Sequence, residues 1–224
     1  MKEKNYSAEI ANAIKSYLKE DDWHFSFDEE TGLFRFGLSL SSKIKKINYI
    51  VDVKEDQYIV YAIAPIGADE EDKKMMATMA EFVCRANYGL KNGNFELDMR
   101  DGEVRFKCFV DCEGITPSKD MVENSIHCPA AMFKRYGSGI VDIIFGNATA
   151  KEAVEKCEKA TEDEMRSLLS ELMEGEGGSE FSEMLAKLAE RLDMPEEGDD
   201  ESPDTGCVPA MIKTDLFGTE GDDE

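Results

Sequence analysis

Six segments between residues 23 and 112 alternate apolar and polar side chains with a period of two, the pattern of half-buried β-strands. Short polar loops join the first four segments, and Asp101-Gly102, a strong short-range hairpin signal, joins the last two. The pattern therefore predicts a four-stranded antiparallel meander followed by a separate hairpin. The expected strands cover residues 23–27, 34–40, 47–53, 58–64, 95–99 and 104–112.

Apolar residues between and after these strands recur at helical spacing. Ser7 is a plausible N-cap for the first helix, and the acidic run 69–72 would lie at the positive end of the second. Pro129 predicts a kink or a restart in the third helix, and Thr149 with Glu152 forms a capping box that would open the fourth. The expected helices cover residues 7–19, 69–90, 118–145 and 149–159. Helices packed with a meander and a hairpin predict an α+β domain.

Charge divides the chain more sharply than any other property. Residues 162–224 hold 21 of the 49 acidic residues and 4 of the 26 basic ones, a net charge of −17 out of the total of −23. We therefore expect a folded domain over residues 1–160. Thr161 with Glu164 forms a second capping box, and two apolar stripes predict an amphipathic helical hairpin over residues 161–194. The low-complexity acidic remainder, residues 195–224, is expected to be largely disordered.

The same charge excludes two classes of partner. Phosphate backbones and anionic membrane surfaces are bound through Lys and Arg, so we expect neither nucleic acid nor membrane as a partner. The N-terminal residues lack the uninterrupted apolar stretch of a signal peptide, which predicts a cytoplasmic location. The six cysteines contain no CxxC pair and are expected to be buried thiols.

Reactive groups do not converge anywhere in the sequence. The two histidines are His24, expected to face solvent, and His127, whose sequence neighbour Cys128 cannot form a catalytic dyad with it. Phosphate-binding glycine motifs, nucleophile motifs and metal-ligand spacings are absent from the sequence. We therefore predict that the chain is not an enzyme and that it has no catalytic residue, no cofactor and no metal.

Two features of the sequence are candidates for binding. The expected sheet carries more aromatic residues than one packed face needs, although each of them is more readily explained as core. Residues 207–217, CVPAMIKTDLF, form an apolar patch in the acidic tail, typical of a docking segment but equally compatible with chance composition. The candidate partner-binding residues are Trp23, Phe34, Phe36, Tyr58, Tyr61, Phe95, Phe109, Met211 and Phe217.

The order of elements and three segments resemble the YbjN family, which shares the fold of type III secretion chaperones. The most specific segment is ANYGLKNGNFELDMRDGEVRFKCFVD, residues 86–111, and residues 21–36 and 129–158 support it. The resemblance implies a packed domain that often dimerises, has no catalytic residues, and belongs to a family described as sensory-transduction regulators without a known mechanism. It implies nothing about the acidic extension, 162–224.

These observations favour a non-enzymatic protein-binding module, chaperone-like or regulatory, that holds a partner protein or peptide on its sheet or helix surface. A homodimer is compatible with the same features. One alternative is a self-regulated module whose C-terminal helices occupy the binding face. The other is a small-ligand sensor, which would require a preformed polar cavity.

Overall fold

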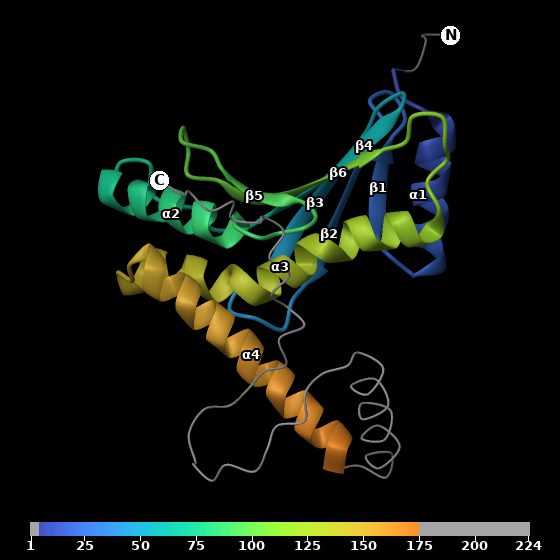
Figure 1. Ribbon diagram of the computed structural model, residues 1–224. Coiled ribbons are helices and arrows are strands. Elements are labelled where there is room, and N and C mark those ends of the chain that lie inside the picture. The colour runs from blue at the N-terminus through green and yellow to red at the C-terminus, as the bar shows by residue number, and fades with distance from the viewer. Residues whose placement is uncertain (1–4, 175–224) are drawn as a thin grey trace, which may run out of the picture. The chain divides into compact units, whose positions relative to one another are not determined.

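The structure is a computed structural model that describes residues 5–174 of the chain. The chain divides into two units at residue 171, and the fold described here is that of the first unit, Met1–Glu171. The described part contains six strands and four helices (Figure 1). They are α1 (Ala8–Glu20), β1 (Phe25–Asp28), β2 (Leu33–Ser39), β3 (Lys46–Val53), β4 (Gln57–Ile63), α2 (Lys73–Asn87), β5 (Asn94–Leu97), β6 (Val104–Asp111), α3 (Lys119–Gly146) and α4 (Ala150–Glu174).

All six strands form one antiparallel sheet in the order β1-β2-β3-β4-β6-β5. The predicted meander supplies the first four strands, and the predicted hairpin adds to its free edge because β6 pairs with β4. At the hairpin turn, Gly102 has a φ of +72°, a conformation that glycine adopts without a steric penalty. The predicted α+β fold class is confirmed.

One face of the sheet forms the main hydrophobic core, and α3 lies against it. Tyr49 and Tyr58 are fully buried there, and their hydroxyls contact the backbone of α3. The Tyr49 hydroxyl donates to the carbonyl of Ile126 at 2.8 Å, and the Tyr58 hydroxyl lies 3.0 Å from Ser125 Oγ. These bonds satisfy polar groups that would be costly to bury unpaired.

The helices α1 and α2 cover the same face at opposite ends of the sheet (Figure 1). On α1, the ammonium group of Lys15 lies 3.7 Å from the centre of the Phe27 ring on β1. At the other end, α2 packs against β5, whose Phe95 ring meets the Phe133 ring of α3 edge to face at 5.4 Å. The three helices therefore bury the face on which Phe27 and Phe95 lie.

One expectation about a helix boundary is wrong, and one of the two alternatives for Pro129 is excluded. The second helix begins at Lys73 rather than at residue 69, because Asp72 caps it and accepts hydrogen bonds from the backbone of Lys74 and Met75. The third helix does not restart at Pro129, which is buried inside α3. Packing against the sheet holds α3 together there, with the Tyr49 hydroxyl bonding the backbone within one turn of the proline.

The fourth helix confirms one predicted cap and corrects another. The backbone N–H of Thr149 donates to Glu152, and the backbone N–H of Glu152 donates to the Thr149 hydroxyl, as the capping box requires. No new helix begins at Thr161, because α4 is continuous through that position and the Thr161 hydroxyl donates to the carbonyl of Cys157 one turn earlier. The domain boundary at residue 160 remains a prediction.

The predicted helix after residue 178 and the acidic tail lie outside the described residues. Among residues 5–174, none of the helices is long and apolar enough to cross a membrane.

Candidate functional site

The second face of the sheet is not covered by any helix of the described chain, and apolar side chains occupy its centre. Ile50 on β3, Ile59, Tyr61 and Ile63 on β4, and Phe109 on β6 all point to this side, since each alternates with residues of the buried face. Strand register makes them neighbours, with Ile50 opposite Tyr61 and Ile59 opposite Phe109. We call these five residues the apolar patch.

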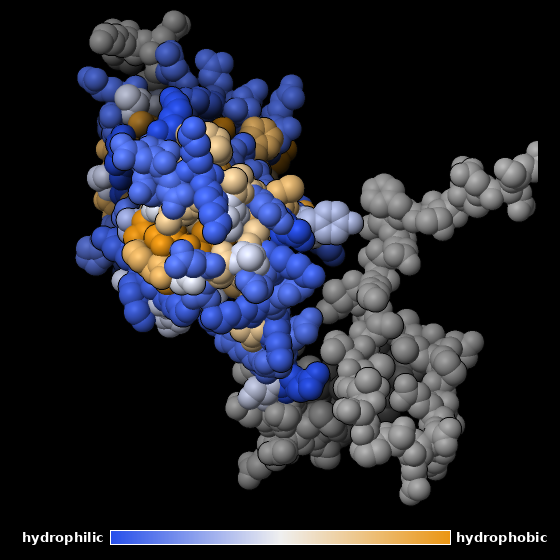
Figure 2. Space-filling model, turned by 90° about the vertical axis from the view of Figure 1, so that its left-hand side faces the viewer, coloured by the Kyte–Doolittle hydropathy of each residue, from blue (hydrophilic) through white to orange (hydrophobic). Residues whose placement is uncertain are grey.

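Exposure differs across the apolar patch. The four residues on β3 and β4 are partly buried by one another, whereas 51% of Phe109 is exposed. Strand register places charged residues beside the patch on the same face, with Arg35 opposite Ile50 and Asp52 opposite Ile59. An apolar centre with polar neighbours is the composition expected of a protein-binding surface. Figure 2 shows one side of the molecule, on which most of the surface is hydrophilic and apolar side chains gather in one region.

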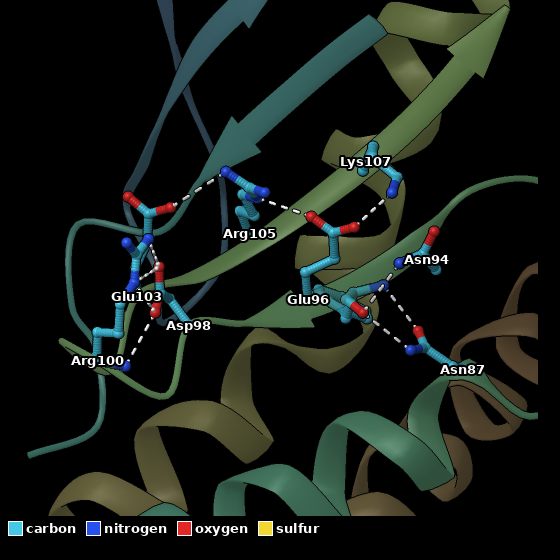
Figure 3. A network of polar contacts seen from close by, with 9 residues as sticks. Asn87, Asn94, Glu96, Asp98, Arg100, Glu103, Arg105 and Lys107 are labelled. Carbon is cyan, nitrogen blue, oxygen red and sulfur yellow. Dashed lines mark hydrogen bonds and ion pairs between the residues drawn. The ribbon is translucent and has the colours of Figure 1, made fainter. Parts of the chain in front are cut away.

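Charged side chains from β5 and β6 border the apolar patch (Figure 3). Glu96 accepts a hydrogen bond from Arg105 at 2.8 Å and another from Lys107, and the Arg105 guanidinium lies 4.6 Å from the centre of the Tyr61 ring. Partial burial works to raise the pKa of Glu96, but its bonds to Lys107 and Arg105 outweigh this and hold the pKa below its ordinary value. Glu103 lies 3.8 Å from the same guanidinium, so two acidic groups face two basic ones and the border of the patch is close to neutral.

A groove of about 590 Å³ runs along the outer edge of β5, beside α2. A peptide that extended the sheet here would need the backbone groups of β5 that face away from β6. At Phe95 both groups are taken: the Asn87 side chain accepts from the Phe95 N–H at 2.7 Å and donates to its carbonyl at 2.9 Å (Figure 3). Asn87 thus imitates one residue of a seventh strand and blocks strand addition at β5.

The predicted binding residues fall into four groups. Phe34, Phe36, Tyr58 and Phe95 lie on the covered face and are at least 92% buried, so a partner cannot reach them without opening the core. Trp23 is partly buried, with its ring 5.2 Å from that of Phe36 and its indole N–H donating to Asp21.

The other predicted residues are placed differently. Tyr61 and Phe109 both belong to the apolar patch, so the structure brings these two together on an accessible surface. Met211 and Phe217 lie outside the described residues, and their role stays a prediction.

Sequence reasoning missed the three isoleucines of the apolar patch. Ile50, Ile59 and Ile63 alternate with buried apolar residues of the covered face, so each strand carries apolar side chains on both sides. That pattern in residues 58–64 predicted a central or covered strand, and β4 is central. The pattern could not show that one side stays uncovered, because this depends on where distant helices pack.

Comparison with known proteins adds little to this geometry. No family model matches the sequence, and no curated protein matches it. Among solved structures, the crystal structure of YbjN from E. coli, described as a proposed transcription regulator, is similar to this chain with a TM-score of 0.41. The two sequences are 9% identical, and the match covers 61% of this chain and 89% of that one. At this level the similarity carries no argument about function.

Proposed function

We propose that this chain is a non-enzymatic binding module that receives an apolar segment of a partner protein on the uncovered face of its sheet. The observation that supports the proposal is the apolar patch: five apolar side chains from three adjacent strands, with charges at the border that are already paired. The module would act in the cytoplasm, and its predicted kinship with the YbjN family is part of the same proposal.

The apolar patch favours face-on docking over strand addition. Docking would remove the exposed half of Phe109 from water, which contributes about 1 kcal/mol for a phenylalanine side chain. The partly exposed isoleucines add smaller amounts over a contiguous area. Because Asn87 occupies the edge of β5 at Phe95, a partner gains less from pairing with that strand.

The partner's chemistry follows from charge. A net charge of −23 on each chain opposes the association of two copies, attracts a basic protein and does not repel a neutral one. We therefore propose a different protein, whose apolar segment is flanked by neutral or basic residues, rather than a second copy.

Photo-crosslinking tests the proposal in the native cell. A benzoylphenylalanine in place of Phe109 should give one main adduct of a discrete partner. Adding Ile59→Asp should abolish the adduct, because it puts a charge into the apolar patch. Adding Ser26→Asp should preserve it, because this exposed β1 residue faces the same side but is separated from the patch by β2.

Three results would reject the proposal. The first is an adduct that persists in the Ile59→Asp chain while that chain still melts cooperatively. The second is capture of the same proteins when the crosslinker is placed at Glu155, an exposed position on α4. An adduct of twice the chain's mass would show that the partner is a second copy. If Ile59→Asp unfolds the chain, the reciprocal pair, with the crosslinker at Tyr61 and Phe109→Asp, gives the same test at a more exposed position.

The self-regulated alternative concerns the predicted helices of residues 161–194, most of which lie outside the described residues, and it stays a prediction. Comparing crosslinks from Phe109 in the full chain and in a chain ending at Glu171 would test it, since a folded-back tail would compete with the partner and its removal would increase capture.

A further inference from the structure

A second cavity, of about 500 Å³, lies where the loop between β2 and β3 meets α3 and α4. None of the apolar-patch residues line it. Its charged lining residues are Lys43, Lys134, Arg135 and Glu164, three basic groups against one acidic group, a net charge of +2. In a chain whose net charge is −23, such a local excess of positive charge is unexpected. We call this cavity the cationic pocket.

Arg135 is the only one of these three basic residues without an acidic partner in the described part of the chain. Its Nε is buried and has no hydrogen-bond partner among residues 5–174, and its guanidinium lies 5.0 Å from the centre of the adjacent Tyr136 ring. Arg135 lines the cavity and no acidic side chain among residues 5–174 pairs with it, and a guanidinium in that state is a strong ligand for an anion.

The two lysines are held in place by acids that do not cancel the excess charge. Lys134 Nζ lies 3.0 Å from Glu164, and Lys43 Nζ lies 2.7 Å from Asp142. Asp142 also pairs with Lys156, and its bonds to Lys156 and Lys43 hold its pKa below the ordinary value. Including both Asp142 and Lys156 leaves the net charge at +2.

The rest of the lining suggests which anion fits. Ser41 supplies a hydroxyl, whereas Met132 and Ala131 supply apolar surface. A phosphate monoester carries a charge of about −1.5 to −2 at pH 7 and has three strong acceptor oxygens, which match the net charge and the many donors of the pocket. A carboxylate carries half the charge and has fewer acceptor positions.

We propose that the cationic pocket binds a small phosphate monoester, with Arg135 as the principal phosphate ligand, the two lysines at its sides, and an apolar substituent lying against Met132. This inference is independent of the proposed protein-binding function. It gives the small-ligand alternative a defined place in the fold and a defined class of ligand.

Titration of the full-length, ¹⁵N-labelled chain tests the proposal by NMR. The probes are inorganic phosphate, phenyl phosphate and acetate at matched ionic strength. Phosphate should produce saturable shifts of the amide signals of Lys134 and Ser138, and phenyl phosphate should bind more tightly than inorganic phosphate. Acetate should bind more weakly than either.

Substitutions assign the effect to the pocket. Arg135→Gln removes the charge at similar size and should weaken phosphate binding at least about tenfold, since bonds to a charged donor are among the strongest. Arg166→Gln is the matched control, because Arg166 is exposed on α4 and does not line the pocket. It should leave the affinity within about twofold, as screening at matched ionic strength limits remote charges.

Lys134→Gln provides a second test at a residue whose side chain is 53% exposed and whose loss should not disturb folding. It leaves Glu164 unpaired at the pocket and should also weaken phosphate binding.

Shifts that stay linear with concentration, equal affinity in Arg135→Gln and wild type, or acetate binding as tight as phosphate would each overturn the proposal. If phenyl phosphate binds no more tightly than inorganic phosphate, the proposed contact between an apolar substituent and Met132 is wrong. Ile59→Asp should leave phosphate binding unchanged.

Discussion

Replacing Asn87 with Ala should destabilise the domain by opening the edge of β5. The side chain makes two hydrogen bonds to the backbone of Phe95, of 2.7 and 2.9 Å. A protein hydrogen bond contributes about 1 kcal/mol net, so the two together contribute about 2 kcal/mol. Alanine recovers up to about 0.5 kcal/mol of helix propensity at this last residue of α2. The expected net loss in the free energy of unfolding is about 1.5 kcal/mol.

Urea unfolding of the full chain measures this loss. With a slope near 2 kcal/mol per molar urea, typical of a small domain, the midpoint should fall by about 0.7 M with the slope unchanged. Hydrogen exchange should show lost protection at the Phe95 amide in particular, because that N–H loses its acceptor.

Asn94→Ala is the matched control, since Asn94 Nδ2 donates a longer bond, 3.2 Å, to the same carbonyl and makes no bond to the Phe95 N–H. It should cost about 0.5 kcal/mol or less, because that carbonyl keeps its bond from Asn87. Equal losses in the two variants, or a Phe95 amide that stays protected in Asn87→Ala, would refute the view that Asn87 completes the sheet edge.

Three other predictions concern single residues. Gly102→Ala should destabilise the domain by well over the roughly 1 kcal/mol that the left-handed conformation costs, because a Cβ at Gly102 would meet the carbonyl oxygen of Ala68. The control is Gly114→Ala, since Gly114 has a similar φ of +73° and open space around it. In a thermal melt it should show only the conformational cost. Burial raises the pKa of Tyr58 to about 12 from 10.0, so its contribution to stability is fully present below pH 10 and is lost as the pH rises to about 12. In unfolding titrations, the free energy of unfolding of Tyr58→Phe should therefore fall by roughly 2 kcal/mol less than that of the wild type over this range. Glu96, whose folded pKa is depressed, stabilises the fold above its ordinary pKa of 4.5, so Glu96→Gln should cost about 1 kcal/mol at pH 7 and the difference should shrink as the pH falls through the folded pKa. A difference between Glu96→Gln and wild type that is the same at pH 7 and pH 3 would contradict this reasoning.

The candidate site shows how far the sequence leads. The apolar residues at 58–64 predicted that β4 would be central, and both faces of that strand are apolar as expected. More aromatic residues lie on the sheet than one packed face needs, yet four of the seven described residues that were singled out for binding lie in the core. Phe34 and Phe109 cannot be told apart by type or periodicity, although one is fully buried and the other is 51% exposed.

Local signals fixed the elements of this protein. The period-two segments, the Asp101-Gly102 turn, the Ser7 cap and the Thr149–Glu152 capping box all appear where the sequence places them, because each depends on residues only a few positions apart. Pro129 is an exception, because α3 continues through it although proline disfavours the interior of a helix.

Only the tertiary structure decided which face of the sheet the helices cover, and hence which aromatic residues are accessible. It also brought Lys43 beside Asp142 and gave Phe95 the amide of Asn87 as its edge partner. These contacts depend on strand register and helix placement, which sum weak interactions between segments far apart in the chain. No short stretch of sequence contains that information.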